Sequence, residues 1–266
     1  MTDLFHDLAP LLWNAFGIAA VFLQEIISTY PALSPPTLTP AHSIRVCNAL
    51  ALLQCVACHP DTRMLLIKAY IPLYLYPILR TTNMSAPYEF LRLASLGVIG
   101  ALVKANTKEV FTFLLSSEII PLCLLNMEIG RETTKTIATF IVEKIMSDEV
   151  GLDYVCATAE RYFAVGRVLD IVLESLEKQP SPRLLKIIIP CYARLSSNPS
   201  RAGLALTSNL PDNFGDVTFI DGLREDPTTW NWVKQLLDNA RANQARSVIG
   251  RGGGGGIDDN VAPSSE

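Results

Sequence analysis

Three segments of this chain share one pattern, and the repetition restricts the fold more than any other feature. Each segment holds a long apolar stretch, a polar turn, a short apolar stretch and then an Ile-Pro or Leu-Pro step, at Pro72, Pro121 and Pro211. The first two prolines are 121 − 72 = 49 residues apart. The next gap, 211 − 121 = 90 residues, leaves room for a divergent unit around 147–149. A period of roughly 40 to 50 residues is typical of armadillo and HEAT units, which stack into a solenoid with an extended groove.

Helix signals dominate the chain, and alternating strand patterns are nearly absent. Residues 45–57 and 131–146 each place apolar side chains on one helical face, and residues 90–103 are so apolar that we expect burial on nearly every side. Ser181-Pro182 is typical of a helix start, with an N-cap serine and a proline in the first turn. We predict an all-α, right-handed armadillo-type solenoid of about five to six repeats, with a non-repetitive helical bundle as the alternative.

Composition agrees with a folded, apolar-rich domain. Of 266 residues 49% are hydrophobic and 18% are charged, which excludes a mostly disordered chain, and six cysteines are too few for a disulfide scaffold. The net charge of −4 argues against a dedicated DNA-binding domain. We predict an armadillo-repeat domain over residues 4–240 and a disordered Gly-rich tail over residues 241–266.

No segment is predicted to direct the chain to a membrane. The first residues lack the basic stretch of a signal peptide, and the uncharged run 8–24 is interrupted by Pro10, Asn14 and Gly17. That run is also short for a bilayer span, so we interpret it as a buried helix. The cysteines are interpreted mainly as small core residues in a reducing cytosolic or nuclear compartment.

The most distinctive local motif is Cys55-Val56-Ala57-Cys58-His59. It matches the attachment pattern of c-type haem, and Cys-x-x-Cys is half of many zinc sites. Haem attachment requires export, and a second pair of zinc ligands at the usual spacing is missing from the sequence. We therefore favour two core thiols beside a turn histidine, and expect no metal and no cofactor.

Catalytic motifs are also missing. The chain has three histidines, His6, His42 and His59, and it has no Gly-x-Ser-x-Gly elbow, Walker loop or Gly-x-Gly-x-x-Gly turn. The chain is therefore predicted not to be an enzyme, and surfaces for binding remain.

One candidate surface is a strip of cations that interrupt otherwise apolar helices. On the inner face of a solenoid they would form a basic groove for single-stranded nucleic acid, with Tyr70, Tyr74, Tyr76 and Tyr88 stacking on bases. The alternative is that they are ordinary polar edges of amphipathic helices. The residues are Arg45, Arg92, Lys104, Arg183, Lys186 and Arg194.

Several long strings resemble one family. "RVCNALALLQCVA", "IPLYLYP", "FLRLASLGVIGALVK" and "FLLSSEIIPLCL" are similar to the required-for-cell-differentiation (Rcd-type, Caf-forty-like) proteins, and the resemblance extends over about residues 7–237. The string over residues 158–166 resembles plant members in particular. The resemblance implies an armadillo subunit of the Ccr–Not deadenylase complex, which shortens poly(A) tails and represses translation.

The resemblance also implies sites. It places contacts with the Not scaffold on the first long helix, at Asn14, Phe16, Ala20 and Ile27, where Asn14 replaces a frequent histidine. It places capture of tryptophans or short helical peptides from repressor and RNA-silencing proteins at Pro121 and Arg161. Ala159 and Ser200 stand where the family usually has tyrosine and arginine, so we expect a weak tryptophan pocket.

The resemblance further implies a cytoplasmic and nuclear protein, with P-bodies among its locations. The helical lead-in of many members is shortened here, so we expect lower stability or self-association as a homodimer. The predicted function is a non-catalytic adaptor of the Ccr–Not complex. The alternative is a stand-alone single-stranded nucleic-acid-binding or transcription-cofactor solenoid.

Overall fold

The computed structural model describes residues 7–197 and 226–251. In these two ranges every regular element is an α-helix or a 3-10 helix, which confirms the all-α prediction. The first elements are α1 (Leu8–Asn14), α2 (Ile18–Ile27) and the 3-10 helix η2 (Tyr30–Ala32). The others are α3 (Pro40–Cys58), α4 (Pro60–Lys68), η3 (Ile71–Leu75), α5 (Tyr76–Leu79), α6 (Ala86–Val103), α7 (Lys108–Ser116), α8 (Ile119–Ile129), α9 (Glu132–Ser147), α10 (Glu149–Cys156), α11 (Ala159–Lys178), α12 (Pro182–Ser196) and α15 (Pro227–Arg251).

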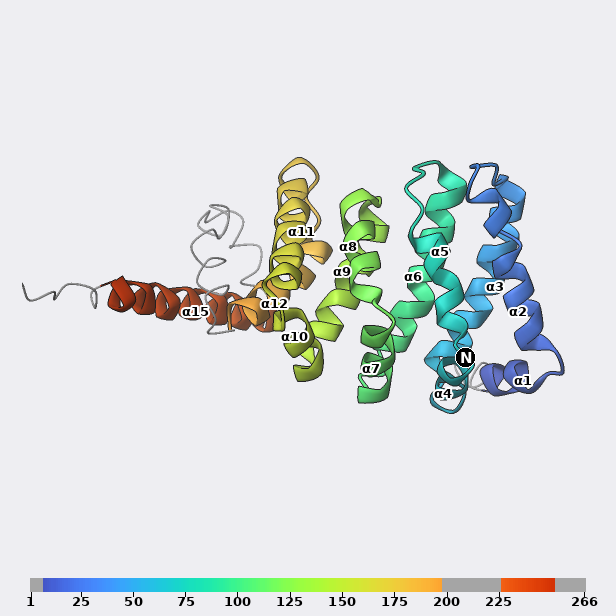
Figure 1. The fold of residues 1–266 in the computed structure, drawn as a ribbon, viewed down its shortest axis with the longest axis horizontal. Coiled ribbons are helices and arrows are strands. Elements are labelled where there is room, and N and C mark those ends of the chain that lie inside the picture. Colours follow the sequence, from blue (N-terminus) through green and yellow to red (C-terminus); the bar gives the residue numbers. More distant parts are fainter. Residues whose placement is uncertain (1–6, 198–225, 252–266) are drawn as a thin grey trace, which may run out of the picture.

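The helices form consecutive units of three. Each unit begins with a long helix, continues with a short one and ends with a third helical segment. The long helices α3, α6 and α9 start at residues 40, 86 and 132, so each start lies 46 residues after the previous one, and α12 follows 50 residues later. The long helices pack side by side in the order α3, α6, α9, α12 and α15, and α5, α8 and α11 form a second row (Figure 1). The chain is therefore a helical-repeat solenoid.

The expected divergent unit is structurally regular. Asp148 begins α10 by accepting a hydrogen bond from the backbone N–H of Val150, and Thr158 begins α11 by accepting one from Arg161. Thr158 therefore stands before the third segment of its unit, close to the positions that Pro72 and Pro121 take in the earlier units. There the chain turns through a left-handed residue, Tyr70 (φ 54°) or Glu118 (φ 58°), just before the third segment. Pro211 lies outside the described residues.

Burial follows the prediction for the central helix. Between residues 90 and 103 of α6, Phe90 is the one exposed side chain, because α6 lies between α3 and α9. The predicted helix start before α12 is also confirmed, since the Ser181 hydroxyl accepts a hydrogen bond from the backbone N–H of Leu184.

Two predicted boundaries need correction. The run 8–24, predicted to be one buried helix, is two short helices that meet at 87°, with Gly17 in a left-handed conformation (φ 76°) between them. The predicted burial is also wrong for Leu11, Phe16 and Val21, which are exposed. At the other end α15 packs on α12 through Val233 and Leu236 and continues to Arg251, so residues 241–251 of the expected tail are helical. Residues 252–266 lie outside the described chain.

By length and composition alone, α3 and α6 could each cross a membrane. The bent pairs 8–32 and 108–129 pass the same test when each pair is taken together. In the solenoid α3 and α6 pack against each other, and 67% of the apolar window of α6 is buried inside the protein. Burial between neighbouring repeats explains why α6 is so apolar.

Candidate docking surfaces

The first end of the solenoid exposes large apolar side chains that no neighbouring repeat covers. Phe16 is fully exposed, and Leu11, Val21 and Ile27 are 70%, 51% and 41% exposed. We call these residues, together with exposed Ala20, the N-terminal apolar surface. The opposite face of α2 buries Phe22 and Ile26 in the core. Large apolar side chains left exposed at one end of a fold are candidates for a protein-binding site.

The residues assigned to the scaffold contact do not share one long helix. Asn14 is the last residue of α1, and its Nδ2 donates to the carbonyl of Pro10 at 2.8 Å. Phe16 lies in the link, and Ala20 and Ile27 lie on the exposed face of α2. The bend at Gly17 separates the two groups, and Gly17 was the sequence signal for it.

Polar contacts hold α2 against α3 beside this surface. Glu25 of α2 forms an ion pair with Arg45 of α3 at 2.9 Å, and the Ser28 hydroxyl lies 2.7 Å from Nε2 of His42. Arg45 is therefore engaged by a carboxylate, although its side chain is 62% exposed. These contacts fix the helix that presents the N-terminal apolar surface.

The two residues assigned to tryptophan capture occupy equivalent repeat positions. Pro121 is the third residue of α8 and Arg161 is the third residue of α11, and these helices pack against each other. The Arg161 guanidinium lies 3.9 Å from the centre of the Tyr154 ring, and its Nη1 donates to the Tyr154 carbonyl. Ala159 is exposed at the start of α11, whereas Ser200 lies outside the described residues.

The predicted basic strip does not form one continuous surface. Arg92 is completely buried, so its assignment to a surface strip is wrong. Lys186 pairs with Asp226 and Arg194 pairs with Glu149, in addition to the Arg45–Glu25 pair. The other two cations, Lys104 and Arg183, line a cavity of about 150 Å³ together with Gln54, Ile137 and Phe140.

Arg92 instead belongs to a buried clamp between two repeats. Its guanidinium pairs with Glu89 at 2.5 Å and donates to the carbonyls of Thr81 and Asn83. The other carboxylate oxygen of Glu89 accepts from the Thr134 hydroxyl and from the backbone N–H of Arg131, at the start of α9. Burial alone raises the Glu89 pKa, but the hydrogen bonds from Thr134, Arg131 and Arg92 and the charge of Arg92 outweigh it and lower that pKa.

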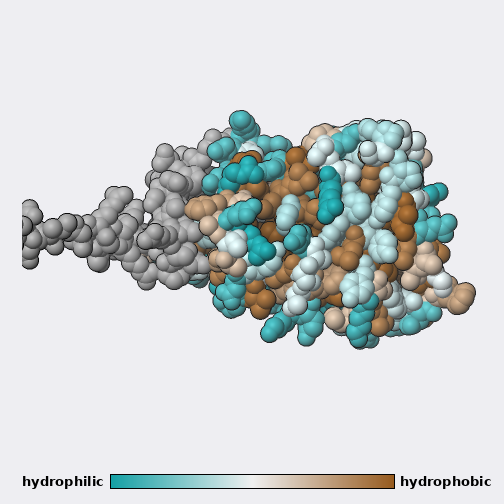
Figure 2. Space-filling view, in the orientation of Figure 1, coloured by the Kyte–Doolittle hydropathy of each residue, from teal (hydrophilic) through white to brown (hydrophobic). Residues whose placement is uncertain are grey.

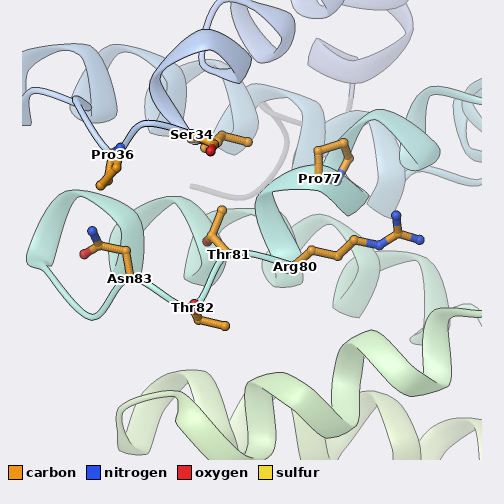
Figure 3. A pocket seen from close by; sticks show the side chains of 8 residues that line it. Ser34, Pro36, Pro77, Arg80, Thr81, Thr82 and Asn83 are labelled. Carbon is orange, nitrogen blue, oxygen red and sulfur yellow. The ribbon is translucent and has the colours of Figure 1, made fainter.

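The clamp lies behind a surface cavity that the sequence analysis missed. The cavity has a volume of about 650 Å³ and lies between the loop 33–36 and the segment 80–83 that joins α5 to α6 (Figure 3). Its walls combine Pro36 and Pro77 with the polar side chains of Ser34 and residues 80–83. Because Arg92 holds the carbonyls of Thr81 and Asn83, one wall of this cavity is fixed by the protein interior.

The cysteine motif at the end of α3 differs from its interpretation. Cys55 and Cys58 are exposed rather than buried, whereas Cys123 and Cys191 are core residues as expected. His59 is the predicted turn residue, because its ring nitrogen Nδ1 accepts from the backbone N–H of Asp61 and begins α4. Among the described residues no three His, Cys, Asp or Glu side chains are grouped to hold a metal ion.

The tyrosines considered for base stacking divide between core and surface. Tyr76 and Tyr88 are buried, whereas Tyr70 and Tyr74 are exposed. Tyr70 contacts Phe113 of the next repeat, with ring centres 6.1 Å apart. Figure 2 shows apolar side chains between polar ones over the visible face of the solenoid, so exposed apolar area is not confined to one helix.

Comparison of the sequence with known proteins shows which family the chain belongs to. The family model described as cell differentiation family, Rcd1-like, matches residues 1–240. The cell differentiation protein rcd1 of Schizosaccharomyces pombe is 54% identical over 235 residues, which cover 88% of this chain and 83% of that protein. Protein CAF40 of Saccharomyces cerevisiae is 51% identical over 234 residues, covering 88% of this chain and 62% of its own length. The repeat solenoid described above belongs to the Rcd1-like cell differentiation family.

Proposed function

We propose that this protein is a non-catalytic adaptor subunit of a Ccr–Not mRNA deadenylase complex. It docks on the Not scaffold through the N-terminal apolar surface and recruits repressor peptides on other helices, which supports mRNA decay and translational repression. Its expected locations are the cytoplasm, including P-bodies, and the nucleus. The observation that carries the proposal is the exposure of Phe16, Val21 and Ile27 at the first end of the solenoid, where the Phe16 side chain is fully exposed.

Two features favour an adaptor over an enzyme. The described residues hold no group of three potential metal ligands, and the sequence holds no nucleophile motif. Buried thiols and hydroxyls are protonated at neutral pH, since burial raises the pKa of Cys123 and that of Tyr76 to about 12. These two buried groups are therefore poorly suited to proton transfer at neutral pH.

The nucleic-acid alternative is weakened by the geometry of the cations. A groove that tracks a phosphate backbone needs several cations free to release counterions. Of the six residues assigned to the strip, one is buried and three are engaged by carboxylates. Binding by apolar docking is expected to change little with salt, whereas phosphate binding falls steeply.

Co-purification with the helical scaffold segment that binds this family tests the adaptor proposal. We expect a one-to-one complex that survives high salt and is lost in Phe16→Asp, because a carboxylate replaces the fully exposed ring. The matched control is Phe163→Asp on α11, which is 49% exposed and lies away from α1 and α2. Equal loss in both variants, or no complex with the unmodified chain, would contradict the proposal.

The second part of the proposal is that tryptophan capture is weak. Arg161 already stacks on Tyr154, and Ala159 offers no aromatic wall. Titration with a Gly-Trp peptide should not saturate at about 1 mM. Ala159→Tyr should strengthen binding by supplying the ring, and Arg161→Ala should abolish that gain. Micromolar binding that depends on Arg161 in the unmodified chain would refute a weak pocket.

A further inference from the structure

The exposed thiols at the end of α3 lie outside the docking surfaces and have no structural role in the core. Cys55 and Cys58 are three residues apart on one helix, and both are exposed. Side chains at this spacing lie on the same face of a helix, one turn apart. Because helical side chains lean toward the N-terminus, the side chain of Cys58 leans over the turn that carries Cys55. The two cysteines are therefore neighbours on the surface, with the Cys55 thiol donating to the Ala51 carbonyl at 3.5 Å before it reacts.

The backbone spacing suits a disulfide. In an α-helix, Cα atoms three residues apart are about 5 Å apart, from a rise of about 1.5 Å per residue on a radius of about 2.3 Å. Disulfides join Cα atoms about 4.4 to 6.8 Å apart. The Cβ atoms need to approach further, from about 5–6 Å in a regular helix to about 4 Å. The last turn of α3 therefore has to tighten when the bond closes.

That last turn is the part of α3 best placed to tighten. Cys58 is the final helical residue, and His59 is already extended, with φ −79° and ψ 134°. The bond from the His59 N–H to the Cys55 carbonyl is long at 3.3 Å. Arg63 of α4 donates to the carbonyls of Ala57 and Cys58, so it brings a positive charge to the end of α3 and remains a support for it.

We propose that Cys55 and Cys58 form a redox-active dithiol that closes to an intramolecular disulfide when a hydroperoxide oxidises it. One thiolate attacks a peroxide oxygen, the O–O bond breaks, and a sulfenic acid and water form. The other thiolate attacks the sulfenic sulfur, the S–O bond breaks, and the S–S bond forms as hydroxide leaves and takes up a proton. In total two thiols and one hydrogen peroxide give one disulfide and two waters. Transient disulfides of this kind occur in reducing compartments.

The test uses the full chain and hydrogen peroxide under native conditions, followed by unfolding, alkylation of free thiols and mass spectrometry. We expect two of the six thiols to escape alkylation, a mass loss of about 2 Da per chain from the two lost hydrogens, and a cross-linked peptide that contains both cysteines. Dithiothreitol should restore all six thiols. Cys123 and Cys191 are buried, so they should react with the alkylating reagent only after the chain is unfolded.

Single substitutions separate this dithiol from general surface oxidation. Cys55→Ser and Cys58→Ser should each remove the cross-linked peptide and leave the remaining thiol as a sulfenic acid that dimedone traps. Cys47→Ser is the matched control on the same helix, and it should keep the cross-link. Circular dichroism checks that the variants fold. A disulfide between two chains, equal oxidation of Cys47, or oxidation of Cys55 without consumption of Cys58 would overturn the proposal.

Discussion

Two ion pairs at different places in the solenoid have contrasting surroundings. Near the first end, Glu25 and Arg45 join α2 to α3 with side chains that are 27% and 62% exposed. In the middle, Glu89 and Arg92 are almost completely buried, and their hydrogen bonds reach the α5–α6 segment and the start of α9. The Glu25–Arg45 pair joins two helices, whereas the Glu89–Arg92 pair lies within α6 and reaches other segments through its hydrogen bonds, shielded from water by repeats on both sides. The comparison shows that position in the array decides how strongly similar residues contribute to stability.

The most direct test of this difference in stability is to remove one charge from each ion pair. Glu89→Gln leaves the Arg92 guanidinium buried without its counter-charge, so we expect a loss of about 3–5 kcal/mol in unfolding free energy. Glu25→Gln removes an exposed pair and should cost at most about 1 kcal/mol. Urea denaturation of both variants measures the difference. Equal losses would show that burial does not distinguish the two pairs.

The same contrast applies to apolar side chains. Leu96 of α6 is completely buried and Leu11 of α1 is 70% exposed. Leu96→Ala should therefore lower the unfolding free energy by about 2–5 kcal/mol. Leu11→Ala should change it by less than about 0.5 kcal/mol. Thermal unfolding of the two variants is the measurement, and a large loss for Leu11→Ala would mean that the N-terminal apolar surface packs against something in the folded protein.

Acid should weaken the middle of the solenoid through Glu89. The pKa of Glu89 is lowered from 4.5 in the folded protein, so the unfolded chain takes up its proton first as the pH falls. The stabilisation from Glu89 is fully present above about pH 4.5 and is lost as the pH falls through the lower folded value. Denaturation midpoints of the unmodified chain should fall below pH 4.5 more steeply than those of Glu89→Gln. Parallel curves would contradict this role.

Two glycines give the smallest effects, with opposite signs. Gly17 has φ 76°, so Gly17→Ala at the first end should destabilise the fold by about 1 kcal/mol. Gly100 lies inside α6, where an added Cβ would be an ordinary 3.7 Å from the side chain of Ile137. Gly100→Ala should stabilise the fold by about 0.5 kcal/mol, because it reduces the freedom of the unfolded chain. Calorimetry of both variants tests the signs.

Periodicity and turn residues were enough to predict the helical class, the repeat and the starts of several helices. They failed where tertiary contacts override local pattern. Arg92 looks like other helix cations in the sequence, and its burial depends on Glu89 and on backbone carbonyls of a separate segment. Cys55 looks apolar and buried, yet it lies on the uncovered face of α3. The scaffold residues were assigned by resemblance, and spacing alone did not indicate that a bend separates them.

The Glu89 carboxylate affects the order in which the repeats of the solenoid unfold. This side chain of α6 accepts two hydrogen bonds from the start of α9. The stability of the second full repeat therefore depends on whether the third repeat is folded. In a nearest-neighbour description of a linear array, such a contact adds to the coupling between repeats rather than to the intrinsic stability of either one. Coupling between repeats is strong at the centre and weak at α1–α2. Local unfolding is therefore expected to start at the first end and to stop at the buried Glu89–Arg92 clamp. Amide exchange should therefore show the helices α6 and α9 becoming accessible together, as one cooperative block.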